Sequence, residues 1–154
     1  PVKPHRFHGG GEMAGYIQER RNRFAAVNFQ KYFIDKQYSI FKTRIVNEML
    51  LCKGIIKLDG CDEHEVHVKF TPGMPPKVTL PKLEETSKFD VHMYNDGSLC
   101  LFYPGDQKWT DYTKIAEYTI PWVIEWIYLY EIWKLTGKWE AEESPVHSKP
   151  FQQN

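Results

Sequence analysis

The residues best suited to chemistry surround Cys100, which follows a short polar turn. Residues 95–97, Asn-Asp-Gly, form this turn, and His92 lies eight positions before the cysteine. A thiolate is a strong nucleophile, and a nearby histidine can move a proton or donate a hydrogen bond to an oxyanion. The alternative interpretation of the same pattern is a small buried thiol at the start of an apolar stretch.

The other two cysteines are less suited to catalysis. Cys52 lies in an apolar segment and is expected in the core, whereas Cys61 is expected in an exposed turn between acidic residues. Three scattered cysteines do not make a disulfide framework and indicate a reducing compartment, so we expect a cytoplasmic protein. We expect no secretory signal, because the chain does not open on a charged segment followed by an apolar one.

The composition indicates a single domain without a strong net charge. The chain has 154 residues, 42% of them hydrophobic and 15% aromatic, and 20 basic residues balance 20 acidic ones. A neutral chain has no overall field to attract nucleic acid or an anionic membrane, so we expect neither as a partner. The longest apolar segment, residues 120–135, carries charges and is too short to span a bilayer.

Metal and cofactor sites are not indicated by the motifs. His64 and His67 are three positions apart, and on a strand this spacing places them on opposite faces. The sequence lacks the ligand spacing of a tetrahedral zinc site and the glycine-rich loop that cradles phosphates. We therefore expect neither a metal ion nor a cofactor.

The elements that would position Cys100 can be predicted from hydrophobic periodicity. Four strands are predicted at residues 40–46, 49–58, 64–70 and 77–80, and in the third we expect Val66, Val68 and Phe70 to face one way. A first helix is predicted over residues 12–33. Its apolar stripe consists of Tyr16, Ile17, Phe24, Val27 and Tyr32.

The last helix is apolar on nearly every side, which is typical of a helix buried on two sides or docked to a partner. Thr119 is predicted as its N-cap, Pro121 fits its first turn and Gly137 fits its end. One face, with the tryptophans, is expected to pack in the core. The opposite face would form a partner surface from Ile124, Tyr128 and Ile132.

The order of elements predicts an α+β domain with an antiparallel sheet. The domain is expected to cover residues 12–137, between a flexible arm at 1–11 and a flexible tail at 138–154. A further helix is predicted to begin within residues 110–117, between the cysteine and the last helix.

Three motifs, taken in their order along the chain, resemble those of the ubiquitin-conjugating enzyme fold: a proline-rich segment, a glycine turn that leads to Cys100, and Trp109. In that family a helix and a four-stranded meander precede a proline-rich segment, a turn with glycine and the catalytic cysteine. The resemblance extends over roughly residues 15–135 and implies that Cys100 is the nucleophile. The motifs here are Met74-Pro75-Pro76-Lys77-Val78, Asp96-Gly97-Ser98-Leu99-Cys100-Leu101 and Trp109.

A narrower resemblance is to the bacterial conjugating-enzyme-like proteins of CBASS antiphage operons, in their stand-alone version. It implies a thioester between Cys100 and the C-terminal glycine of a cGAS-like nucleotidyltransferase, the CD-NTase of the operon. Transfer or modification would then prime that synthase for cyclic-nucleotide signalling against phage. The residues that carry this resemblance are 92–94, 96–105, Trp109, 120–122, Glu125, Trp126 and 136–139.

The chain departs from the common family at the position of the asparagine that stabilises the oxyanion, where His92 stands. A histidine can also donate to an oxyanion or take a proton from an attacking amine. It can equally only brace the turn, and both roles stay open. Tyr94, Asp96 and Trp109 are the supporting candidates, and Asp96 is expected mainly to shape the turn.

Two other functions compete with acyl transfer. A non-catalytic adaptor would bind and regulate the synthase through the same fold, using the partner face of the last helix. Alternatively, Cys100 would form a disulfide with a cysteine of a partner. A reductant would cleave this link but not an amide bond, which distinguishes the two.

Overall fold

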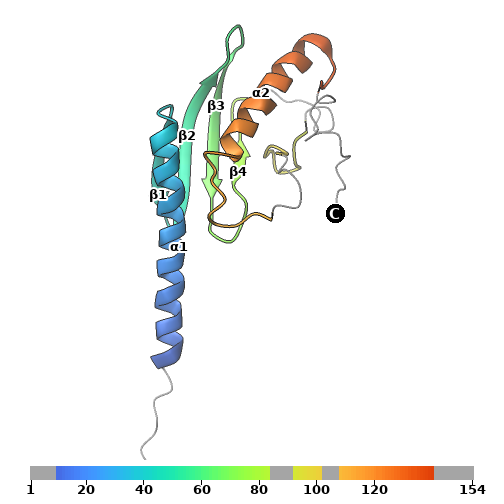
Figure 1. The fold of residues 1–154 in the computed structure, drawn as a ribbon. Helices are drawn as coiled ribbons and strands as arrows, with labels where there is room; N and C mark the ends of the chain where they lie inside the picture. The colour runs from blue at the N-terminus through green and yellow to red at the C-terminus, as the bar shows by residue number, and fades with distance from the viewer. Residues whose placement is uncertain (1–9, 84–91, 102–107, 141–154) are drawn as a thin grey trace, which may run out of the picture.

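The computed structural model describes residues 10–83, 92–101 and 108–140 (Figure 1). The chain forms an α+β fold with the predicted order of a helix, four strands and a second long helix. The elements are α1 (Gly10–Gln37), β1 (Phe41–Val46), β2 (Met49–Lys57), β3 (Glu63–Phe70), β4 (Lys77–Thr79) and α2 (Thr119–Thr136).

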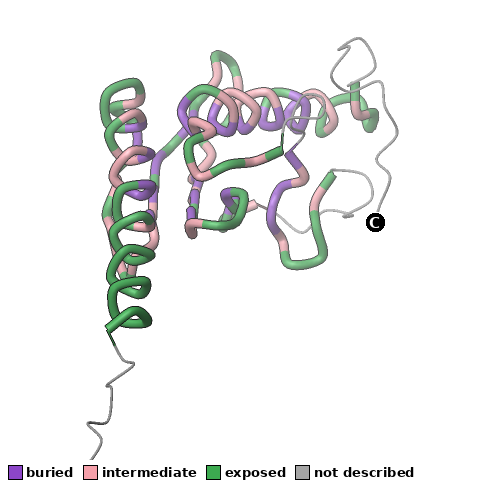
Figure 2. The backbone as a smooth tube through the Cα atoms, turned by 60° about the horizontal axis from the view of Figure 1, so that its bottom comes forward, coloured by how far each residue is buried: buried purple, intermediate pink, exposed green. Residues whose placement is uncertain are grey.

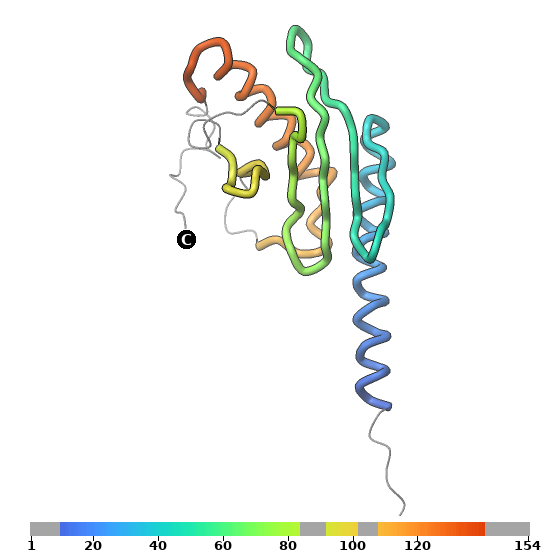
Figure 3. Tube along the Cα trace, turned by 180° about the vertical axis from the view of Figure 1, so that it is seen from behind, coloured from blue at the N-terminus to red at the C-terminus, as the bar shows by residue number. Residues whose placement is uncertain are grey.

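The four strands form one antiparallel meander in the order β1-β2-β3-β4. Both helices lie on the same face of this sheet, as Figure 3 shows from behind. The core face of β3 is as predicted, because Val66, Val68 and Phe70 are each 2% exposed or less. Cys52 lies opposite Val68 on β2 and is buried, which confirms its expected place in the core.

Helix α1 packs on the sheet only through its C-terminal half (Figure 1). The predicted apolar stripe is therefore wrong for four of its five members, and only Val27 is buried. Tyr16, Ile17, Phe24 and Tyr32 are exposed. Periodicity shows that a segment is helical but not how far the sheet beneath it extends. The residues that α1 does bury are Ala26, Val27, Gln30 and Ile34.

Residues 111–118 form turns and bends, so the helix predicted within residues 110–117 is wrong. The buried side chain of Gln30 on α1 organises this segment. Its Nε2 donates to the carbonyl oxygens of Asp111 (2.7 Å) and Thr113 (2.9 Å), and its Oε1 accepts from the amide of Ile115 (2.9 Å). Because these backbone groups bond to a side chain, regular helical hydrogen bonding does not start there.

Helix α2 buries most of its sheet-facing side (Figure 2). Trp126 is buried, and Trp122 and Trp133 are partly buried against the core, as expected for the tryptophan face. Across the described residues, neither helix combines the length and apolarity of a membrane-spanning segment.

Helix α2 begins one residue earlier than predicted and ends at the predicted glycine. The prediction of Thr119 as N-cap is wrong: Thr119 is the first helical residue and fully buried, and Tyr118 occupies the cap position without a side-chain cap. At the other end, Gly137 adopts φ 72° and its amide bonds to the Trp133 carbonyl (2.8 Å), as predicted.

The predicted arm and tail fall largely outside the described residues. Positions 1–9 and 141–154 are not described. Residues 10 and 11, assigned to the arm, belong to α1, and Trp139, assigned to the tail, packs against the core.

Gly54 on β2 is required by the close approach of the residues that begin β1. A Cβ atom at Gly54 would lie 2.8 Å from the Ile40 carbonyl oxygen and 2.8 Å from a ring carbon of Phe41. We expect Gly54→Ala to lower the free energy of unfolding by about 1–3 kcal/mol, because overpacking displaces the backbone. Urea denaturation of the purified protein measures this change.

Gly15→Ala is the matched control, because Gly15 lies in α1 with nothing within 4 Å of the added Cβ. Alanine at an exposed helical position should raise the free energy of unfolding by roughly 0.5–1 kcal/mol. Equal effects of the two substitutions would show that the contact at Gly54 is unimportant.

Candidate functional site

Cys100 closes a tight hairpin that begins at His92. The amide of Cys100 donates to the His92 carbonyl oxygen (2.9 Å), and the amide of Tyr94 donates to the carbonyl oxygen of Ser98 (2.8 Å). Gly97 makes the turn possible, because its φ of 83° favours glycine. The hairpin therefore holds the cysteine backbone opposite that of His92.

Asp96 shapes this turn, as the sequence predicted. One carboxylate oxygen accepts hydrogen bonds from the amide (2.9 Å) and hydroxyl of Ser98, and the other accepts from Lys77 Nζ (2.7 Å). The bonds from Lys77 and Ser98 hold the pKa of Asp96 well below its usual range. A carboxyl group with a lowered pKa stabilises the fold above its ordinary pKa, and this contribution is lost as the pH falls through the lowered value.

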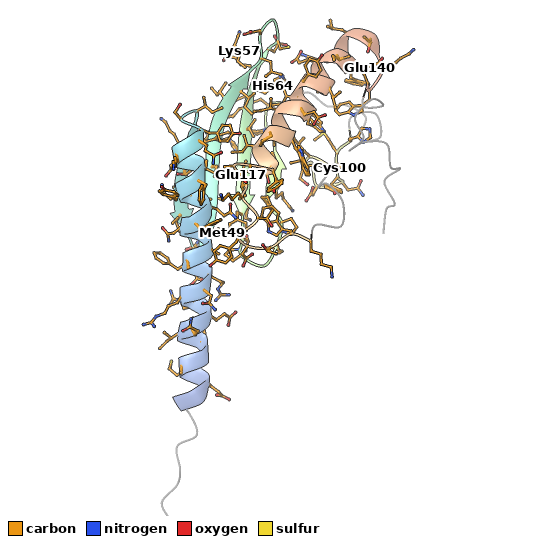
Figure 4. The ribbon with its side chains drawn as sticks, viewed as in Figure 1. Met49, Lys57, His64, Cys100, Glu117 and Glu140 are labelled. Atoms are coloured by element: carbon orange, nitrogen blue, oxygen red, sulfur yellow. The ribbon has the colours of Figure 1, made fainter. Side chains whose placement is uncertain are left out.

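Two elements of the core hold the hairpin in place. The amide of Leu99 donates to the carbonyl oxygen of Val78 (2.9 Å), which ties the hairpin to β4. Trp126 Nε1 donates to the His92 carbonyl oxygen (3.3 Å), which ties it to α2. Leu99 is buried, and Cys100 lies beside α2 on the side away from α1 (Figure 4).

The thiol of Cys100 is half-buried, and its environment acts on its pKa in two ways. Burial raises the pKa above its ordinary value, and a hydrogen bond with the Tyr94 side chain partly offsets the increase. Cys52 is far more buried, and desolvation raises the pKa of its thiol to about 12, which makes it inert near neutral pH. Cys100 is thus partly accessible, and its raised pKa means that the thiol must lose its proton before its sulfur can act as a nucleophile.

Comparison with known families places this geometry in context. Residues 30–148, more than three quarters of the chain, match the family model described as Type II CBASS E2 protein. The chain belongs to the type II CBASS E2 family. No curated protein matches the chain in a sequence comparison.

In this CBASS E2 protein, the backbone and the ring of His92 both help to hold the hairpin in place. Its φ is 51°, an uncommon value for a residue other than glycine, and it turns the carbonyl oxygen toward both donors. Its exposed imidazole packs on the ring of Trp139, with centroids 5.0 Å apart, and Trp139 contacts Trp126 (5.4 Å). His92 therefore braces the hairpin, and its catalytic role stays a prediction.

The remaining predicted site residues lie in different environments. Trp109 packs edge-on against Phe70 (6.2 Å), so it supports the core beneath β3. On the predicted partner face of α2, Tyr128 is 55% exposed, whereas Ile124 and Ile132 are only partly exposed.

His64 is held by a protein side chain. Its Nε2 lies 2.5 Å from an oxygen of Glu131, which joins β3 to α2. Within the described ranges, no group of three or more His, Cys, Asp and Glu side chains is arranged to hold a metal ion.

Three residues that support the candidate site were not predicted as site residues from the sequence: Lys77, Trp126 and Trp139. Each supports the hairpin from a distant part of the chain, through Asp96, the His92 carbonyl or the His92 ring. The motifs that carry the resemblance contain all three residues. Their presence was therefore visible in the sequence, but their contacts were not.

The hydrogen bond between Tyr94 and Cys100 yields a direct prediction. Tyr94→Phe removes an interaction that lowers the pKa of the thiol, so the pKa should rise further. Iodoacetamide should then alkylate Cys100 several-fold more slowly near neutral pH, with the pH–rate profile displaced to higher pH. Mass spectrometry of the intact protein follows the reaction. Tyr128→Phe is the control, and a profile unchanged by Tyr94→Phe would exclude the bond to the thiolate.

Proposed function

We propose that this protein transfers acyl groups, with Cys100 forming a thioester with the C-terminal glycine of the CD-NTase of the operon. Transfer or modification of the synthase would then prime cyclic-nucleotide signalling against phage. The observation that supports this proposal best is the half-exposed Cys100 thiol at the end of a hairpin fixed by β4 and α2. Membership of the type II CBASS E2 family supports conjugation as the general activity.

The chemistry proceeds in two balanced steps. The Sγ atom attacks an activated carbonyl carbon, the thiol loses its proton, and the activating group leaves with the bonding electron pair. An amine nitrogen then attacks the thioester carbon and loses a proton, and the C–S bond breaks to restore the thiol. The activated carboxylate is the co-reactant that this mechanism requires.

The raised pKa of Cys100 suits a carrier of this kind. A thiolate of higher pKa is a poorer leaving group, so the thioester survives longer before an acceptor arrives. Release then depends on stabilising the oxyanion that forms when the amine attacks. We assign this role to the imidazole of His92, whose backbone lies opposite Cys100.

A non-catalytic adaptor is the second candidate. The exposed ring of Tyr128 on α2 favours it, because this ring offers a contact surface away from Cys100. In either case we propose a cytoplasmic location, in keeping with the three free cysteines.

Substitution of Cys100 tests acyl transfer. Cys100→Ala should abolish the covalent adduct with the CD-NTase on a gel run without reducing agent. Cys100→Ser should trap an oxyester that resists thiols, because oxygen replaces sulfur as the acyl carrier. Cys61→Ala, which removes another free cysteine, is the matched control and should form the adduct normally.

Three outcomes would contradict acyl transfer at Cys100. An adduct that persists in Cys100→Ala would place the bond elsewhere. Normal complex formation with full phage protection by Cys100→Ala would favour the adaptor. An adduct that dithiothreitol cleaves but neutral hydroxylamine does not would identify a disulfide.

The role of His92 can be separated from that of Cys100 in a single-turnover experiment. His92→Ala should slow discharge of the isolated thioester to an amine on the order of 100-fold, because an oxyanion donor is lost. Loading of Cys100 should change much less. His92→Asn should recover part of the rate, because asparagine supplies an amide donor and tolerates the positive φ. Discharge at the wild-type rate in both variants would leave His92 with its bracing role alone.

A further inference from the structure

The face of the sheet opposite the two helices carries a dense group of basic side chains. No other described element covers this face (Figure 3). A hollow of about 780 Å³ is lined there by six basic side chains, which come from all four strands. We call this group the outer basic face: Lys42, Arg44, Lys53, His67, Lys69 and Lys77.

The strand register arranges these side chains in two rows. Lys42 lies directly opposite Lys53, and Lys69 lies directly opposite Lys77. Neighbouring strands are about 4.8 Å apart, and like charges in directly opposed positions destabilise a sheet. Like charges are therefore held close together on this face, although one lysine of each opposed pair also has a carboxylate partner.

Acidic side chains lie near three of the six members of the outer basic face. Glu65 lies 3.2 Å from Lys53 and 3.7 Å from His67, and Asp96 pairs with Lys77 (2.7 Å). Among the described residues, no carboxylate lies within ion-pair distance of Lys42, Arg44 or Lys69. The neutral total charge of the chain thus conceals a local positive field on one side of the sheet.

The side chains on this face indicate which anion it fits. The two rows contain no phenylalanine, tyrosine or tryptophan, so the large rings on which unpaired bases usually stack are absent from these rows. Lysine is depleted from the buried centres of protein–protein interfaces, yet four lysines line this hollow. Lys, Arg and Thr side chains are the groups that contact phosphates of a duplex without reading its sequence.

We propose that the outer basic face binds the phosphodiester backbone of duplex nucleic acid, independently of sequence. This binding goes beyond acyl transfer and does not involve the Cys100 thiol. The side chains that would contact the phosphates are Lys42, Arg44 and Lys69, which have no acidic partner among the described residues, together with Lys53. Thr79, which lies opposite His67 and lines the same hollow, adds a hydroxyl donor.

Fluorescence anisotropy with a short labelled DNA duplex of mixed sequence tests this proposal. The variant Lys42→Gln/Lys53→Gln/Lys69→Gln removes three charges from the face. The matched control Arg21→Gln/Lys36→Gln/Lys108→Gln removes three exposed charges outside the hollow. Thermal unfolding should show the first variant to be about as stable as the wild type, because the loss of opposed like charges offsets the loss of the exposed Lys53–Glu65 ion pair.

We expect the wild-type affinity to fall steeply with salt, because phosphate contacts release counterions. The first variant should weaken binding by more than about tenfold at low salt. It should also reduce the slope of log K against log salt by about one for each lost contact. The control variant should retain the wild-type affinity and slope.

Several results would overturn the proposal. One is the absence of duplex binding by the wild type at low salt, and another is equal weakening by the two triple variants. Tighter binding of a single strand of the same length would mean that bases are recognised. Tighter binding of a labelled polyglutamate peptide would instead identify an acidic protein as the partner.

Discussion

The carbonyl oxygen of His92 holds Cys100 against helix α2. It accepts hydrogen bonds from the amide of Cys100 and from the indole of Trp126. A carbonyl oxygen has two lone pairs, so both donors can be satisfied at once. This arrangement requires the unusual φ of His92, and the Gly97 turn and the Asp96 ion pair keep the hairpin closed around it. The sheet and α2 matter to the site because they supply these anchors.

The two faces of the sheet have opposite physical characters. Toward the helices, strands β2 and β3 bury apolar side chains in register, such as Cys52 opposite Val68. On the other face, alternation along the same strands places basic side chains next to one another. The period of two residues in a strand therefore produces both the core and the outer basic face. A count of charges over the whole chain does not distinguish the two.

Local patterns in the sequence were sufficient to predict the element order, the buried face of β3 and the end of α2 at Gly137. They were also sufficient for the turn before Cys100, because the chemistry of Asp96 and Gly97 acts over a few residues. They failed where a distant group decides the structure. Gln30 replaces helical bonding within residues 110–117, and α2 begins one residue earlier than predicted, with Thr119 buried in its first turn. The anchors of the site, Lys77 and Trp126, act across the fold, so no local pattern could assign their contacts.

Helix α1 combines two segments of different stability in one continuous element. Residues 10–22 are all exposed, and their main link to the sheet is through Arg20, which pairs with Glu48. A helical segment of this length is marginal in water without tertiary packing. The half that carries Gln30 and Ile34 can open only when the core opens, whereas the first half can unwind by itself. The amide hydrogens of this single helix thus exchange with solvent in two groups, through local unwinding in the first half and through opening of the core in the second. The boundary lies near Arg23, where burial begins.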